Sequence, residues 1–228
     1  MNQDHHAAAW QRVSAATGSP TLAAGCRACA DDLEADFAGV NLVTAGELRL
    51  MGAATDERAR LVEDAQLVTG EGPCTDAFAR RAPVLVQDLH HAADRWPVFA
   101  PSACEQGARS VLALPLAIGT LTIGALDLYR CVPIRFTPVQ RERGEAYARV
   151  LAVLALYEHP HLLAAPTRPA KPGPHGYPPT VHMAAGVIAA KYGLSADDAL
   201  ARLRAHSFRH NQPLLRTAEH VIDHQRLD

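Results

Sequence analysis

Cys26 and Cys29 are separated by two residues, a spacing that can bring two sulfurs together in a redox disulfide or around a metal ion. A structural zinc site needs four ligands, and no second pair of Cys or His residues with ligand spacing follows in the sequence. On a helix, positions three residues apart simply share one face. We therefore interpret the pair as a packing face and predict no metal site.

Cys74 lies in the segment Gly-Glu-Gly-Pro-Cys, where Pro73 suits the first turn of a helix. A helix N-terminus lowers the pKa of a thiol, but a nucleophilic cysteine also needs a positioned base, and the neighbouring sequence offers none. The sequence also lacks a P-loop and a Gly-x-Ser-x-Gly motif. We predict no catalytic residues and no cofactor, and instead a ligand pocket that includes Gly72, Cys74 and Trp96.

Cationic side chains concentrate towards the C-terminus. Residues 168–228 hold 8 Lys and Arg against 5 Asp and Glu, whereas residues 1–167 hold 14 against 19. This asymmetry permits a nucleic-acid partner, although solvated helix faces explain it equally well. Arg and Lys neutralise phosphates, Asn and Arg hydrogen-bond to splayed bases, and His stacks on them. The predicted RNA-binding residues are Lys191, Arg204, Arg209, His210, Asn211 and Arg216.

Three short helices are expected to position these side chains. Thr180 is expected to cap the first helix, and Gly193 to end it in a left-handed conformation. Ser195 is expected to cap the second helix, and Pro213 to begin the third. The apolar faces predicted for the second and third helices include Ala199, Leu200, Leu203, Phe208, Leu214, Leu215, Ala218, Val221 and Ile222.

The preceding residues alternate between helical and strand patterns. Helices are predicted over residues 19–36, 56–68, 97–106 and 137–157, with a short helix beginning at Pro73. Strands are predicted over residues 39–44, 47–54, 81–89, 110–119 and 120–130. This order indicates an α+β fold, an antiparallel sheet flanked by helices, followed by the three-helix bundle. The predicted domains are residues 1–158, a proline-rich linker at 159–179, and residues 180–228.

Composition narrows the class of protein. The sequence contains no apolar run long enough for a membrane span and no secretory signal at its start. Five cysteines, an odd number, favour a reducing compartment over a disulfide framework. We expect a cytoplasmic protein without a membrane partner.

Residues 180–226 resemble the ANTAR domain, an RNA-binding three-helix module of bacterial antiterminators. The resemblance rests on A-x-G at 184–186, K-Y-G at 191–193, S-A-D-D-A at 195–199 and L-R-A-H-S-F-x-x-N-x-P-L at 203–214. It implies binding of paired RNA hairpin loops, which prevents a terminator from forming. Met183 and Ala185 replace residues that are usually polar in the family, which implies weaker binding or a different loop.

Residues 20–157 resemble a GAF domain, a form often joined to ANTAR in regulatory proteins. The phrases G-E-G-P-C at 70–74, P-V-L-V-x-D-L at 83–89, R-W-P-x-F at 95–99 and G-A-L-D-L-Y at 124–129 carry this resemblance. It implies a domain that senses an unknown small molecule or the redox state. The proline-rich linker stands where ANTAR proteins usually have a long dimerising helix. We therefore expect a homodimer through the helices at 19–36 and 137–157.

Other functions remain open from the sequence. The bundle could contact a protein instead of RNA, in a signalling module without RNA binding. A cysteine-dependent enzyme similar to free methionine sulfoxide reductases, using Cys74 or Cys104, is a further alternative. A helix-turn-helix DNA-binding protein is less favoured, because the middle helix lacks an obvious base-reading face.

Overall fold

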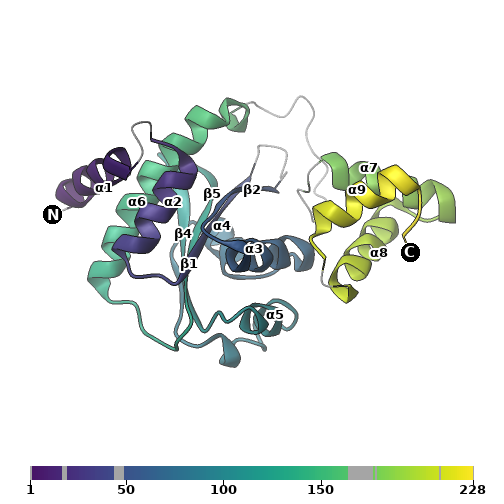
Figure 1. The fold of residues 1–228 in the computed structure, drawn as a ribbon, viewed down its shortest axis with the longest axis horizontal. Coiled ribbons are helices and arrows are strands. Elements are labelled where there is room, and N and C mark those ends of the chain that lie inside the picture. The colour runs from purple at the N-terminus through teal and green to yellow at the C-terminus, as the bar shows by residue number, and fades with distance from the viewer. Residues whose placement is uncertain are drawn as a thin grey trace.

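The computed structural model consists of a helix-flanked sheet beside a small helical bundle (Figure 1). It describes residues 2–16, 20–43, 49–163, 177, 179–210 and 212–227. The predicted α+β domain followed by a helical bundle is confirmed. No helix among the described residues is both long and apolar enough to span a membrane.

The described strands form one antiparallel sheet in the order β2-β1-β5-β4-β3. They are β1 (Phe37–Val43), β2 (Arg49–Ala54), β3 (Val84–Val86), β4 (Ser110–Ile118) and β5 (Leu121–Arg130). The near-continuous apolar sequence of β5 predicted a central strand, and β5 lies in the middle of the sheet with both faces covered. The strand predicted over 81–89 is shorter than expected, and the turn predicted at 45–46 lies outside the described residues.

Two helices cover one face of the sheet, α2 (Leu22–Asp32) and α6 (Pro138–Glu158), and α1 (Asn2–Ala16) packs against these two helices (Figure 1). Helix α6 begins as predicted, with a capping box between Thr137 and Gln140. Helix α2 begins later than predicted, because the Oγ1 atom of Thr21 accepts the hydrogen bond from Ala24 N at 3.1 Å. Helix α1 was not predicted. Only Ala9 and Val13 of its described side chains are buried, so its sequence lacks a clear apolar period.

The other face of the sheet carries α3 (Glu57–Thr69), α4 (Pro73–Arg80), a short 3₁₀ turn (Leu89–His91) and α5 (Phe99–Glu105). Ala125 and Tyr129 of β5 point to this face, whereas Ile123, Leu126 and Leu128 belong to the opposite core. Helix α3 lies between the sheet and the C-terminal bundle (Figure 1). It therefore contacts both parts of the protein.

The bundle consists of α7 (Pro179–Tyr192), α8 (Ala196–Arg209) and α9 (Leu214–His224). Gly193 is left-handed, with φ of +65°, and the Ser195 Oγ atom caps α8 by accepting the N–H of Asp198 at 3.1 Å, as predicted. Thr180 does not cap α7, because that helix already includes Pro179. Phe208 and Leu215 are 51% and 39% exposed, which corrects their predicted burial. Most of the predicted linker lies outside the described residues.

Candidate functional sites

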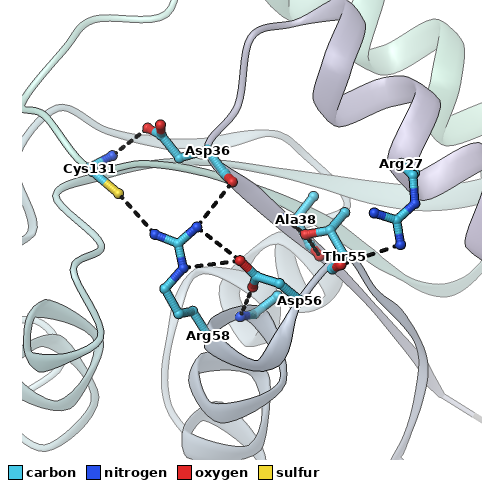
Figure 2. Close-up of polar contacts among 8 residues, drawn as sticks. Arg27, Asp36, Ala38, Thr55, Asp56, Arg58 and Cys131 are labelled. Carbon is cyan, nitrogen blue, oxygen red and sulfur yellow. Dashed lines mark hydrogen bonds and ion pairs between the residues drawn. The ribbon is translucent and has the colours of Figure 1, made fainter.

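The N-terminal end of α3 is fixed to the sheet by a polar network (Figure 2). The Asp56 carboxylate caps the helix by accepting the N–H of Ala59 at 2.9 Å, and it also accepts from the Arg58 guanidinium. Arg58 donates further to the carbonyl of Asp36 and to the sulfur of Cys131. Since Asp36 and Cys131 adjoin strands β1 and β5, this network sets where α3 crosses the sheet.

Beyond this network, α3 and β5 enclose a cluster of buried polar side chains. Gln66 Nε2 donates to Asp127 Oδ2 at 2.7 Å, to Glu63 Oε2 at 3.0 Å and to the Tyr129 hydroxyl at 3.1 Å. The Tyr129 hydroxyl donates to Glu63 Oε1 at 3.0 Å, and the Asn41 side chain from β1 donates to Glu63 Oε2. All five residues are buried. Burying polar groups costs free energy unless they are hydrogen-bonded. A buried cluster with this many shared hydrogen bonds therefore indicates a structural or functional role beyond apolar packing.

Burial changes the acidity of the cluster. It raises the pKa of Glu63 well above its ordinary value, and the neighbouring Asp127 carboxylate raises it further. Burial also raises the pKa of Asp127 to about 7, although the bonds from Gln66 and Tyr129 oppose this change. Burial thus disfavours the charged form of both carboxyl groups, so two carboxylates here require a proton or a cation to neutralise them.

The Gly-Glu-Gly-Pro-Cys segment connects α3 to α4 and to α5. Gly72 has φ of +135°, and a Cβ atom there would meet Gln66 Oε1 at 2.4 Å. The same Gln66 oxygen accepts the N–H of Cys74 at 2.8 Å. Glu71 Oε1 accepts the N–H groups of Val98 and Phe99 at 2.7 and 2.9 Å, at the start of α5. The motif therefore joins three helices on the cluster's side of the sheet.

Gly72, Cys74 and Trp96, the predicted pocket residues, lie on this same side of the sheet. Cys74 and Trp96 are 4% and 2% exposed and belong to one apolar core. A cavity of about 380 Å³ adjoins β3 and the loop before α6, and another of about 610 Å³ adjoins β3 and the 3₁₀ turn. Neither of these two cavities includes the three residues. Their role in ligand binding stays a prediction.

At its C-terminal end, α3 contacts the bundle. The Arg204 guanidinium donates to the carbonyl of Thr69 at 2.6 Å and to that of Val68. The Asp64 carboxylate accepts the N–H of Leu214 at 3.0 Å, and Val68 packs into the bundle's core. Carbonyls at a helix C-terminus attract cations, so Arg204 complements the charge of α3. Burial raises the pKa of Asp64 to about 6, while the Leu214 N–H opposes that rise.

The described residues among the predicted RNA-binding set lie on all three helices of the bundle. Arg209 and His210 are exposed at the end of α8, where the His210 ring lies 4.3 Å from that of His206. Arg216 is exposed on α9 and lies 3.6 Å from Glu219. Lys191 is exposed on α7 and donates to the carbonyl of Gln225 at 2.6 Å. Arg204 faces α3, and Asn211 lies outside the described residues.

The remaining sequence motifs are structural. Cys26 and Cys29 are completely buried on α2, in agreement with a packing face. Of the two positions that depart from the ANTAR pattern, Ala185 packs inside the bundle. Met183 is 59% exposed.

Comparison with known families finds two domains in the chain. The model of the GAF domain matches residues 21–160, and that of the ANTAR domain matches residues 179–222. The chain belongs to the GAF domain family and carries a C-terminal ANTAR domain. This architecture is that of a regulator, with a GAF sensor domain before an ANTAR output domain.

Solved structures agree on the GAF fold. A GAF domain from a phosphoenolpyruvate-protein phosphotransferase of Coxiella burnetii has a TM-score of 0.53 and 16% identity, covering 70% of this chain and 95% of that one. The corresponding GAF domain from Acinetobacter has a TM-score of 0.52 and 17% identity, with the same coverage. At this identity the likeness shows the fold alone. No match to a curated protein was found.

Sequence reasoning did not identify Glu63, Asp64, Gln66 or Asp127 as site residues. The available signal was weak: Asp127 interrupts the apolar sequence of β5, and Glu63 and Gln66 lie three residues apart on a predicted helix. An acidic residue in a central strand is a reason to look for a buried site. The sequence alone could not show which residues of α3 would face it.

Proposed function

We propose that this protein binds RNA hairpins through α7–α9 to cause antitermination, and that its GAF domain controls access to the RNA-binding surface. The match to ANTAR over residues 179–222 supports the RNA partner. The single observation that supports the control is the contact of Arg204 with the end of α3. Because that guanidinium is already hydrogen-bonded, it contacts RNA only after the bundle leaves α3.

Helix α3 is the element through which a signal would pass. Its residues Glu63 and Gln66 belong to the buried polar cluster, while Asp64 and Val68 contact the bundle. A small movement of α3 in response to a ligand therefore changes both the buried polar cluster and the contact between α3 and the bundle. Ligands act in this way when they bind one arrangement more tightly than the other.

Arg209 and Arg216 are exposed and do not touch the GAF domain in the described contacts, so they are the cations we assign to the first encounter with RNA. We expect the alanine variant of either residue to weaken RNA binding and to reduce the dependence of affinity on salt by about one unit in the log–log slope. Arg141→Ala, an exposed arginine on α6, is the matched control and should leave both quantities unchanged.

The experiment begins with crosslinking in cells and sequencing of the bound RNA. The recovered hairpins are then used in filter binding at several salt concentrations and in transcription across a terminator. We expect micromolar or tighter binding and increased readthrough. Millimolar affinity, or the same affinity in both arginine variants as in the wild type, contradicts the RNA role.

A protein partner is the second candidate, and one observation favours it. Met183 on α7 and Phe208 on α8 are 59% and 51% exposed, and large exposed apolar residues are typical of protein interfaces. Recovery of a defined protein that binds the wild type but not Met183→Ser, together with no crosslinked RNA, would favour this function over the first.

A further inference from the structure

Two carboxylates and a thiol meet inside the GAF domain. One oxygen of Glu63, one oxygen of Asp127 and the sulfur of Cys74 all lie within 4.8 Å of one another. They come from three elements, α3, β5 and α4, and all three residues are buried. Folding of the whole domain, not local sequence, therefore brings them together.

The neighbours that hold the carboxylates are uncharged. The described hydrogen bonds to Glu63 and Asp127 come from the amides of Asn41 and Gln66 and from the hydroxyl of Tyr129, and the two carboxyl groups also hydrogen-bond to each other. Donors of this kind orient a carboxylate but do not cancel its charge. Two buried carboxylates this close together require either protons or a cation between them.

Asp127 carries a second indication of a ligand. Its side chain is completely buried, and its Oδ1 atom has no hydrogen-bond partner among the described residues. Buried polar atoms in native proteins nearly always have a partner, and an ion is one common reason for an exception. The lone pairs of this oxygen are thus available to a cation.

We propose that Glu63, Cys74 and Asp127 bind a divalent transition-metal ion, with Zn²⁺ and Fe²⁺ as the best chemical match. Thiolate is a soft ligand and carboxylate a hard one, and a mixed set suits these ions better than Mg²⁺ or Ca²⁺, which prefer oxygen alone. Two carboxylates and a thiolate also supply the negative charge that the cation needs. Three protein ligands leave a coordination position for water or for a small ligand.

The hydrogen bonds around the site keep its ligands in position. Gln66 bonds to Asp127 through Nε2 and to the backbone of Cys74 through Oε1, so one side chain orients two ligands. Gly72 leaves the space that Gln66 occupies, and Gly39 leaves space for Glu63, since a Cβ at Gly39 would meet Glu63 Cγ at 2.4 Å. Outer partners of this type are typical of metal sites.

The test measures metal binding by the full chain without RNA, so its outcome is independent of the proposed function. The reduced protein is stripped with a chelator, dialysed against Zn²⁺, and analysed for bound metal. Substitution with Co²⁺ then reports the ligands, because a thiolate ligand gives a charge-transfer band. We expect one equivalent per chain, a thiolate band, and a higher melting temperature in Zn²⁺.

Cys74→Ala should abolish the thiolate band, and Asp127→Asn should weaken binding at least about tenfold, the lower limit for disturbing even an outer partner. Cys104→Ala is the matched control and should keep the band. Asp127→Asn removes a buried charge, so melting of its metal-free form verifies that it folds.

Two results would overturn the proposal. The first is that the wild type binds less than a tenth of an equivalent of Zn²⁺ when the metal is in about a hundredfold excess and no competing ligand is present, which would mean that protons neutralise the cluster. The second is a band that persists in Cys74→Ala but disappears in Cys26→Ala, which would assign the metal to the Cys26–Cys29 pair.

Discussion

Gly72 sets how closely the loop before α4 approaches α3. Its positive φ is strained for any other residue, and its missing Cβ leaves room for Gln66. We predict that Gly72→Ala lowers the free energy of unfolding by about 3 kcal/mol, from backbone strain together with displacement of a buried amide. Urea unfolding followed by circular dichroism measures this change.

Gly119→Ala is the control for the backbone term. Gly119 also has a positive φ, of +60°, but a Cβ atom there meets nothing within 4 Å. We expect it to cost about 1 kcal/mol, the strain of a left-handed residue alone. If Gly72→Ala and Gly119→Ala lower the free energy of unfolding equally, the contact with Gln66 contributes nothing to stability.

Single residues were predictable where the physical reason is local. Gly193 and Ser195 follow from helix-capping rules, which involve only neighbouring backbone groups. Arg204 and Glu63 were not predictable in their roles, since their partners lie far away in the sequence. Phe208 follows the apolar period of α8 but lies beyond the bundle's core.

Pro213 is the N-cap residue of α9 and has no side chain able to accept a hydrogen bond from the first turn. Asp64 of α3 accepts the N–H of Leu214 instead, so the cap comes from another domain. We predict that Asp64→Ala lowers the free energy of opening α9 by about 1 kcal/mol, the typical contribution of a helix cap. Hydrogen exchange of the α9 amides measures it directly.

Asp197→Ala, in the exposed first turn of α8, provides the comparison for that substitution. It changes the charge by the same amount without touching α3, so α9 should exchange as in the wild type. Unchanged protection of α9 in Asp64→Ala would contradict the role of the interdomain cap.

Elements were predictable when their periodicity was strong. Helices α3 and α6 and strands β4 and β5 have clear apolar patterns and occur close to the predicted positions. Helix α1 is dominated by alanine and polar residues, so its burial against α6 depends on tertiary contact. Of the strand predicted over residues 81–89, only the three residues Val84–Val86 pair with β4, at the edge of the sheet.

At the scale of the whole molecule, the homodimer expected through α2 and α6 stays a prediction. Helix α1 covers part of α6, but Val153 and Tyr157 remain exposed one turn apart, at 45% and 82%. We predict a dimer in light scattering that Val153→Arg with Tyr157→Arg converts to a monomer, because two charges would be buried at its interface. Val132→Arg, at an exposed valine outside α6, should remain dimeric.

The division into two domains was predictable because each has its own sequence pattern. The contact between the two domains was not predictable, since it includes a few polar groups together with Leu67 and Val68 on α3. These residues have no signature that distinguishes them from a solvated helix face. The interface is nevertheless what connects the buried cluster to the ANTAR helices in the proposed mechanism.

The most direct test compares the RNA affinity of the wild type, Asp64→Ala and Arg204→Ala on a hairpin recovered by crosslinking. Loosening the bundle by about 1 kcal/mol, with every cation retained, should tighten the apparent affinity of Asp64→Ala up to about fivefold. Arg204→Ala releases the same contact but removes a phosphate-binding group, so it should bind more weakly than Asp64→Ala. Equal affinity in the wild type and Asp64→Ala, with α9 more exposed in the variant, would contradict control of RNA binding through α3.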